Sequence, residues 1–248
     1  MGEIKYEKRC CAFVDFLGFK EFVKNKKAEE IYMVISALSD ENKRNSENVF
    51  ENLKYQAFSD NIFLSTPHTK FGIINLFLQV NWLFMRALQN GVLIRGAITV
   101  GDIHQDDNKN IVFGDALIET YELESKVAIY PRVILSKSAH SFIVANDTDV
   151  LEQYFRQSKD GIWFLHVCDD NVKLAGIDWQ PTAKPIIQKM LKENIDKPEA
   201  YKKIRWFAEY YNSTVEQDYS SSTGIHIDDL KALGLYPKHL TIELPYWP

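Results

Sequence analysis

Cysteine is scarce in this chain, and its three copies form no pairing pattern. Cys10 and Cys11 are adjacent at the start of an apolar run, and Cys168 stands alone. An odd number of cysteines without a C-x-x-C pair excludes a disulfide framework, and we expect reduced cysteines in the core. The charged segment 1–9 precedes only a short apolar stretch, so it does not resemble a secretory signal. These features predict a cytoplasmic protein.

Long hydrophobic runs and several common enzyme motifs are also missing. The most apolar stretch, 73–88, is interrupted by Asn75, Gln79, Asn81 and Arg86, which makes it too short and too polar for a membrane span. The chain has no G-x-S-x-G, G-x-x-x-x-G-K-[ST] or G-x-G-x-x-G motif. The sequence therefore gives no support for a hydrolase with a nucleophile elbow, a P-loop NTPase or a dinucleotide-binding protein. Its histidines are dispersed, which argues against a zinc site.

An excess of positive charge is lacking as well. The net charge is −5, and apolar residues make up 46% of an otherwise ordinary globular composition. A nucleic-acid partner is therefore not expected, because phosphate contacts require a basic face. A nucleotide substrate remains compatible with this charge, since a bound metal ion can offset a triphosphate locally.

Hydrophobic periodicity predicts an alternation of strands and helices. The expected elements are strand 10–16, helix 19–38, a hairpin around 59–61, helix 71–90, strand 92–100, polar loop 101–110, helix 115–126 and strand 131–135. This order predicts an α+β fold with a ferredoxin-like or palm antiparallel sheet and helices on one face. We expect one domain over residues 1–145. Residues 146–248, with a helix at 199–212, would form a C-terminal helical extension packed on it.

Two aspartates stand where a palm sheet brings chain segments together. Asp15 interrupts an apolar strand and taken alone is better explained as a helix cap, while Asp60 alone is better explained as a turn residue. In a β-α-β-β arrangement, however, the end of the first strand lies beside the hairpin tip. Two carboxylates there can hold Mg²⁺ or Mn²⁺, and two such ions could activate a hydroxyl and grip a triphosphate.

The segment after Asp15 is a candidate phosphate seat. Phe16, Leu17, Gly18 and Phe19 enter the next helix, and Gly18 would allow close approach of a phosphate to backbone N–H groups. A simple glycine turn explains the same residues.

Four motifs in order resemble class III nucleotide cyclases. They are Cys11-Ala-Phe-Val-Asp-Phe-Leu-Gly-Phe, Tyr55-Gln-Ala-Phe-Ser-Asp-Asn-Ile-Phe-Leu, Ile94-Arg-Gly-Ala-Ile-Thr-Val-Gly-Asp and Val112-Phe-Gly-Asp-Ala-Leu-Ile-Glu-Thr-Tyr-Glu-Leu-Glu-Ser. The last block, with Tyr130-Pro-Arg-Val and Lys203-Ile-Arg-Trp-Phe, looks like the Pycsar group of bacterial anti-phage pyrimidine cyclases.

The resemblance implies a specific chemistry. The ribose 3′-hydroxyl of UTP, or less often CTP, would attack the α-phosphorus and release pyrophosphate. Two Mn²⁺ or Mg²⁺ ions would lie at Asp15, Phe16 and Asp60, and a homodimer would share its active sites across the interface. The cyclic product would act on a separate effector.

Several positions depart from the family pattern. Gln56, preceded by Tyr55, replaces the lysine that reads purines, and Ile111 replaces its aspartate partner, so Tyr55 and Gln56 are implied to read a pyrimidine from the partner subunit. Ile118 and Glu122 replace the ribose-binding asparagine and the transition-state arginine.

These replacements leave alternatives open. Arg95 or Arg132 could supply the missing positive charge, with Arg95 the favoured catalytic residue. Glu122 is better explained by an ion pair with Lys126, four residues on. A catalytically inactive nucleotide-binding homodimer fits the same departures, whereas a palm nucleotidyltransferase acting on polymer ends is disfavoured by the acidic balance.

Overall fold

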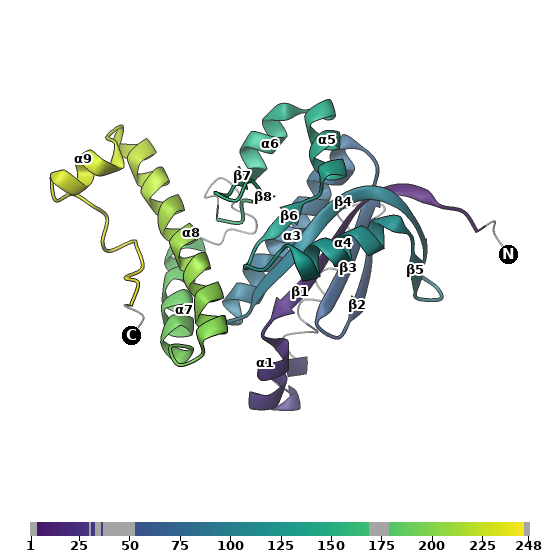
Figure 1. The fold of residues 1–248 in the computed structure, drawn as a ribbon, viewed down its shortest axis with the longest axis horizontal. Coiled ribbons are helices and arrows are strands. Elements are labelled where there is room, and N and C mark those ends of the chain that lie inside the picture. Colours follow the sequence, from purple (N-terminus) through teal and green to yellow (C-terminus); the bar gives the residue numbers. More distant parts are fainter. Residues whose placement is uncertain (1–3, 30, 33–35, 37–52, 169–178, 246–248) are drawn as a thin grey trace. The chain divides into compact units, whose positions relative to one another are not determined.

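The computed structural model describes residues 4–29, 31–32, 36, 53–168 and 179–245, which form two compact units (Figure 1). The units are Met1–Val167 and Cys168–Pro248. The sequence placed the boundary near residue 145, but residues 146–167 contribute strands to the sheet of the first unit. How the second unit packs on the first stays a prediction.

The first unit is built on one sheet, which has eight strands in the described part of the chain. The strands are β1 (Glu7–Leu17), β2 (Lys54–Phe58), β3 (Asn61–Pro67), β4 (Leu93–Asp106), β5 (Ile111–Phe113), β6 (Val133–Leu135), β7 (Phe155–Gln157) and β8 (Trp163–Leu165). They follow the order β2-β3-β1-β4-β6-β8-β7, and β5 pairs with β4.

The four strands β2-β3-β1-β4 form the antiparallel core of this sheet. This confirms the predicted α+β palm, with one difference. The strand β6 runs parallel to β4, so the whole sheet is mixed and not purely antiparallel.

Helices cover both faces of the sheet, and the expectation of helices on one face is wrong (Figure 1). On one face, the Thr66 hydroxyl donates to the Gly72 carbonyl of α3 (Lys70–Gln89) at 2.8 Å. On the other, Ala116 of α4 (Asp115–Lys126) packs in a buried cluster that includes Cys11 and Phe13. Cys11 and Thr66 belong to alternate positions of the β1–β3 ladder and therefore point to opposite faces.

The helix α3 confirms the predicted helix 71–90. The Thr69 side chain caps its start by accepting from the Gly72 N–H at 2.9 Å, and it ends before Gly91, whose φ of 72° is left-handed. In the described part of the chain, it is the one helix long and apolar enough to cross a membrane, and 67% of its apolar window is buried inside the protein.

Other predicted boundaries need correction. The polar stretch 101–110 is not a loop throughout, because β4 continues to Asp106 and forms a hairpin with β5. Of the predicted helix 19–38, the structure shows α1 (Phe19–Asn25), and several of the remaining residues lie outside the described part. The helices α5 (Lys137–Asn146) and α6 (Thr148–Tyr154) follow β6.

The second unit is helical. It contains α7 (Trp179–Glu193), α8 (Pro198–Thr223) and α9 (Ile227–Ala232). Tyr211 of α8 is 1% exposed, and its hydroxyl lies 3.0 Å from the Gln180 carbonyl and 3.2 Å from the Leu240 carbonyl. This buried tyrosine ties the two long helices to the C-terminal segment, which confirms the predicted helical extension.

Candidate active site

The end of β1 and the tip of the β2–β3 hairpin meet, as the palm order predicts. Asp15 lies opposite Asn61 of β3 in the antiparallel ladder, and the Phe16 N–H donates to the Asp60 carbonyl at 3.1 Å. The Asn61 side-chain amide donates to Oδ1 of Asp60 at 3.2 Å. Two carboxylates that are 45 positions apart in the chain therefore lie at one edge of the sheet.

Arg95 completes this cluster from β4, where it lies opposite Asp15 on the other side of β1. Its Nε donates to Oδ2 of Asp15 at 3.1 Å. The same Nε lies 2.7 Å from Oε1 of Glu124 on α4, although without hydrogen-bond geometry. One guanidinium thus serves two carboxylates.

Burial controls the ionisation of these carboxylates. The Asp15 side chain is 16% exposed and that of Glu124 is 4% exposed. Removal from water raises the pKa of Asp15, and the hydrogen bond from Arg95 opposes that rise. Burial likewise raises the pKa of Glu124 to about 7, against the attraction of Arg95. The buried carboxyl groups of Asp15 and Glu124 thus share one positively charged partner, the guanidinium of Arg95.

The donor chemistry of this cluster fits a hard divalent cation. Asp15, Asp60 and Glu124 offer carboxylate oxygens, and Oε1 of Glu124 is buried without a hydrogen-bond partner among the described residues. No group of three or more His, Cys, Asp or Glu side chains is already arranged as a metal site in the part of the chain that the structure describes. Metal binding at Asp15, Phe16 and Asp60 stays a prediction.

In the segment 16–19, which the sequence predicts to bind phosphate, some backbone groups already have hydrogen-bond partners within the protein. The Phe16 N–H is engaged by the Asp60 carbonyl, and the Phe16 side chain is 3% exposed in the core. Leu17 ends the ladder opposite Leu93. Gly18 has a φ of 78°, and its carbonyl accepts from the first turn of α1, which Phe19 opens. Among these residues, Gly18 has the open surroundings that a ligand needs.

The register of β2 separates the two predicted base-reading residues. Gln56 lies opposite Phe63, which packs on the α4 side of the sheet, and this is also the side of Asp15. Gln56 is 4% exposed, and its Nε2 donates to the Asn110 carbonyl at 2.8 Å. Tyr55 immediately precedes Gln56 on β2, so its side chain points to the opposite face of the sheet. Only Gln56 shares a face with the carboxylates.

Arg132 is occupied elsewhere. Its Nη2 lies 2.7 Å from Oδ2 of Asp160, and its Nη1 donates to Oδ1 of Asp160 at 3.2 Å and to the Ser158 hydroxyl at 2.7 Å. The arginine side chain is 2% exposed. The guanidinium of Arg132 thus connects the loop before β8 to the start of β6. Of the two arginines, Arg95 therefore remains the candidate positive charge of the site.

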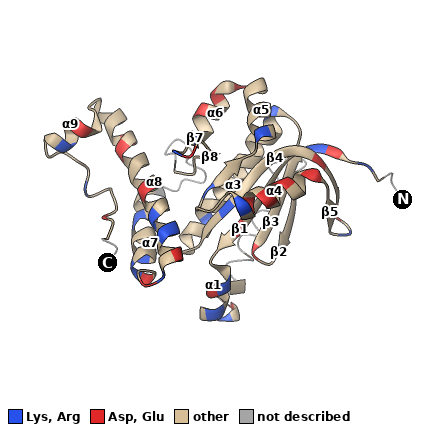
Figure 2. Ribbon diagram, in the orientation of Figure 1, with Lys and Arg blue, Asp and Glu red and all other residues tan. Residues whose placement is uncertain are grey.

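The helix α4 carries acidic residues along its length (Figure 2). Glu122 pairs with Lys126 at 2.8 Å, which confirms the predicted ion pair, and Ile118 is 59% exposed. Glu124 was not predicted as a site residue. It lies four residues from Thr120 and eight from Ala116 on the buried side of α4, and because two of these three residues are polar, no hydrophobic periodicity marks this side in the sequence.

Solved nucleotide cyclase domains share this fold. The adenylyl cyclase CyaB from P. aeruginosa aligns with a TM-score of 0.51 and 14% identity over 66% of this chain and 96% of that chain. A dimeric guanylyl cyclase domain of the RhoGC fusion protein from the aquatic fungus Blastocladiella emersonii aligns with a TM-score of 0.50 and 14% identity, again over 66% and 96%. No family model and no curated protein matches the sequence. The chain has the class III nucleotide cyclase fold, as its motifs predict.

Proposed function

We propose that this chain is a nucleotide cyclase that converts UTP, or less readily CTP, to the 3′,5′-cyclic monophosphate and pyrophosphate. The observation that supports this most is the meeting of Asp15 and Asp60 at one edge of a class III cyclase sheet, with Arg95 bonded to Asp15. In this reaction the bond from O3′ to the α-phosphorus forms while the bond from that phosphorus to the pyrophosphate oxygen breaks. The 3′-hydroxyl proton is lost to solvent.

Asp15, Asp60 and the Phe16 carbonyl would hold two Mg²⁺ or Mn²⁺ ions, with Glu124 close by. Bound there, such ions supply Lewis acidity toward the triphosphate and lower the pKa of the attacking hydroxyl. Arg95 donates to Oδ2 of Asp15, so Oδ1 would remain for a cation. Arg95 is the group of this cluster that could stabilise charge on the transferring phosphoryl.

Gln56 is the better candidate of the two for contacting the base, since it shares the face of the sheet with Asp15. It is 4% exposed and its Nε2 donates to the Asn110 carbonyl, so contact with a base would require the exchange of that bond. The preference for uracil over cytosine rests on the resemblance to the Pycsar group and not on a residue. So do the role in anti-phage signalling and the separate effector for the cyclic product.

A homodimer with shared active sites is part of the proposal. Two large apolar side chains three residues apart on α4 are exposed, and we refer to them as the α4 surface: Ile118 is 59% exposed and Tyr121 54%. Neighbouring exposed apolar side chains on one helix support a protein–protein contact. A second copy is the partner that the fold and the shared-site model call for.

The test is a product assay. Purified protein is incubated with Mn²⁺ and each of the four nucleoside triphosphates, and cyclic mononucleotide is measured by mass spectrometry. We expect cyclic UMP as the main product and a loss of at least a hundredfold in Asp15→Asn and Asp60→Asn. The variant Asp228→Asn, whose side chain is 78% exposed in the second unit, is the matched control and should retain full activity.

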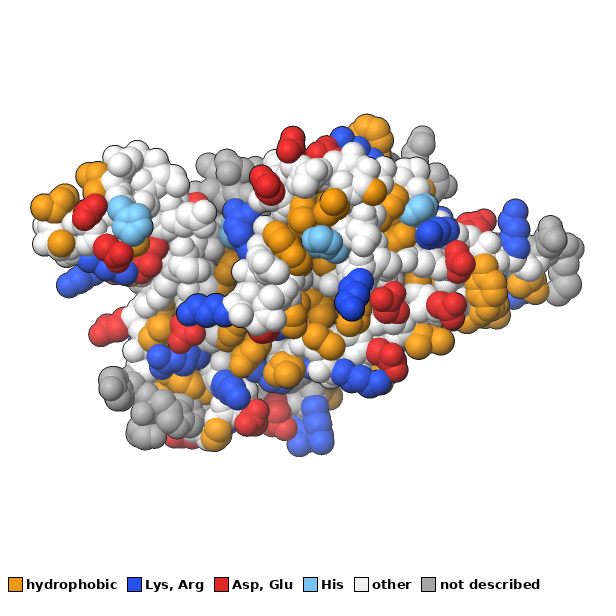
Figure 3. Space-filling model, turned by 45° about the horizontal axis from the view of Figure 1, so that its top comes forward, with side chains coloured by type: hydrophobic (Ala, Val, Ile, Leu, Met, Phe, Trp, Pro, Cys, Tyr) orange, Lys and Arg blue, Asp and Glu red, His pale blue; other side chains and the backbone are white. Residues whose placement is uncertain are grey.

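The alternative is a catalytically inactive nucleotide-binding dimer, which the replacements at Ile118 and Glu122 favour. Absence of product from all four triphosphates, with nucleotide binding unchanged in Asp15→Asn, would establish that alternative. Extension of a polymer end is disfavoured, because Lys, Arg, Asp and Glu side chains are intermixed on the face in Figure 3 and form no continuous basic surface there.

A further inference from the structure

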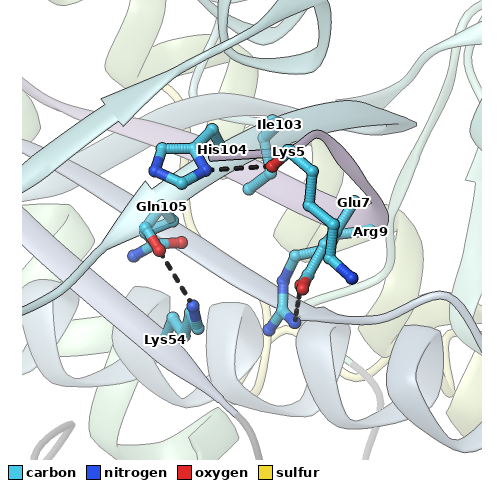
Figure 4. Close-up of a pocket in the computed structure, with 7 residues that line it drawn as sticks. All are labelled: Lys5, Glu7, Arg9, Lys54, Ile103, His104 and Gln105. Carbon is cyan, nitrogen blue, oxygen red and sulfur yellow. Dashed lines mark hydrogen bonds and ion pairs between the residues drawn. The ribbon is translucent and has the colours of Figure 1, made fainter. Parts of the chain in front are cut away.

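A polar hollow opens on the first unit, far along β1 from Asp15 (Figure 4). Its walls come from the start of β1, from β2 and from the distal half of β4, and include Glu7, Arg9, Lys54, Ile103, His104 and Gln105. Its empty volume is about 350 Å³, part of which is open to solvent. Arg9 and Asp15 are six residues apart on one strand, so the hollow lies roughly 20 Å from the carboxylate cluster.

Positive charge dominates this hollow. Lys5, Arg9 and Lys54 line it, against the single carboxylate of Glu7. That carboxylate is 55% exposed and lies 3.9 Å from Nη1 of Arg9, a distance at which a solvated pair is weak. Asp107 offsets Lys54 from outside at 3.7 Å. Three cationic residues therefore line the hollow against one acidic residue.

Arg9 is fixed in place at the wall of the hollow. Its side chain is 8% exposed, its Nε donates to the Ser65 hydroxyl at 3.0 Å, and its Nη2 donates to the Ser65 carbonyl at 3.2 Å. Burial lowers the pKa of this guanidinium, and the carboxylates of Glu7 and Asp107 oppose that shift. A bound anion would add to their favourable interaction with Arg9.

Gln105 supplies an unused donor at the same place. The Ser65 hydroxyl accepts from Nε of Arg9 and donates to Oε1 of Gln105 at 2.8 Å. In this orientation of the amide, the other terminal atom is the NH₂ group. That Nε2 is buried and has no hydrogen-bond partner among the described residues. A buried donor of this kind calls for an acceptor.

Lys54 provides a third donor from β2. Its Nζ donates to the Gln105 carbonyl at 3.1 Å, which holds the ammonium group at the hollow, and its side chain is 27% exposed. Arg9 and Lys54 approach the hollow from different sides (Figure 4). Donors that converge from separate strands suit a tetrahedral anion with acceptor oxygens on all sides better than a flat carboxylate.

We propose that this hollow is a binding site for a phosphate-type dianion, held by Arg9, Lys54 and the amide NH₂ of Gln105. The shared chemistry covers free inorganic phosphate and the phosphoryl group of a small phosphomonoester. The site is separate from Asp15 and Asp60, and it does not depend on the proposed cyclase activity. The strands β1 and β4 carry residues of this hollow and also Asp15 and Arg95.

The experiment is a calorimetric titration of the full chain with inorganic phosphate, at an ionic strength held constant with sodium chloride. Asp15→Asn serves as the background, so that the proposed catalytic site is disabled. We expect saturable binding with one phosphate per chain. In Gln105→Glu, which keeps the acceptor for Ser65 but replaces the NH₂ donor by a charged oxygen, affinity should fall at least tenfold.

Two further variants make the result decisive. Lys54→Gln should weaken phosphate binding severalfold, and since its side chain is partly exposed it should fold even if Gln105→Glu does not. Lys189→Gln removes a cation that is 73% exposed in the second unit and should leave binding unchanged. Circular dichroism verifies the fold of each variant.

The ligands distinguish the possible sources of the anion. Tighter binding of methyl phosphate than of inorganic phosphate assigns a phosphomonoester, and the reverse assigns free phosphate. Equal binding of acetate, absence of saturable phosphate binding, or unchanged affinity in the folded pocket variants overturns the proposal.

Discussion

At the scale of single residues, the site depends on a carboxylate that the motifs did not indicate. Glu124 is held within 2.7 Å of Arg95 Nε, and Arg95 also binds Asp15. Buried acids of this kind are costly when charged, so the guanidinium compensates both in the absence of metal. Asp15, Arg95 and Glu124 therefore act as one unit, and a substitution at any of them changes the ionisation of the others.

The first prediction concerns the pH dependence of stability. Burial raises the pKa of Glu124 from 4.5 to about 7, so the folded protein binds this proton more tightly than the unfolded chain does. Stability of the metal-free protein should therefore decrease as the pH rises from about 5 to about 7, the range in which unfolding releases that proton. Glu124→Gln has no proton to lose there, and its melting temperature should depend less on pH.

Thermal melts in EDTA over this pH range measure the effect. The control is Glu122→Gln on the same helix, whose carboxylate is 55% exposed and paired with Lys126. Its pH profile should follow that of the wild type. Parallel profiles for the wild type and Glu124→Gln would contradict the prediction.

At the scale of elements, β4 and α4 position the site, and the sequence described them unequally well. The helix 115–126 was predicted with its observed bounds, because Gly114 marks its start. The strand was predicted too short. The second half of β4 contains the polar residues Asp102, His104 and Asp106, and this composition predicts a loop. Pairing with β1 and β5 nevertheless keeps it extended.

The second prediction concerns the start of α4. Gly114 has a φ of 141°, and a Cβ added there would lie 2.4 Å from the Asp102 carbonyl oxygen of β4. Gly114→Ala should therefore destabilise the protein by about 2 kcal/mol or more, because both backbone strain and a steric clash are introduced. It should also displace α4 and with it Glu124.

Chemical denaturation measures the loss. Gly161→Ala is the matched control, since Gly161 has a φ of 80° but nothing within 4 Å of the added Cβ. It should cost only about 1 kcal/mol from the left-handed backbone. Equal losses at the two glycines would show that the contact between α4 and β4 is not close.

At the scale of the whole molecule, Ile118 and Tyr121 form the exposed α4 surface, which lies on the first unit. The edge-to-face contact of Tyr121 with Phe13, at 5.7 Å between centroids, connects this surface to the core below it. This contact holds Tyr121 in place on the surface that we propose for a second copy of the chain.

The third prediction tests that dimer. Ile118→Glu places a charge in the middle of the surface, and desolvating that charge should shift the protein toward monomer by at least tenfold in dissociation constant. If active sites are shared, activity should fall with dimer content. Analytical ultracentrifugation over a range of concentrations measures the first effect, and the product assay measures the second.

The control for the dimer test is Leu233→Glu in the second unit, where the leucine is 64% exposed. It should leave both the mass and the activity unchanged. A wild-type protein that is monomeric at all concentrations, or an Ile118→Glu variant with the mass of the wild type, would refute the role of this surface.

The sequence by itself determined the palm order of the first strands and helices and the meeting of Asp15 with Asp60, and the resemblance of four motifs predicted the cyclase fold. The palm order follows from hydrophobic periodicity and turn residues, which are local properties of the chain. Only the tertiary structure decided that Arg95 and Glu124 join Asp15, that Arg132 is bound to Asp160, and that Tyr55 and Gln56 face opposite sides. Such contacts depend on strand register and helix placement, and a change of one residue in register reverses the face of every side chain.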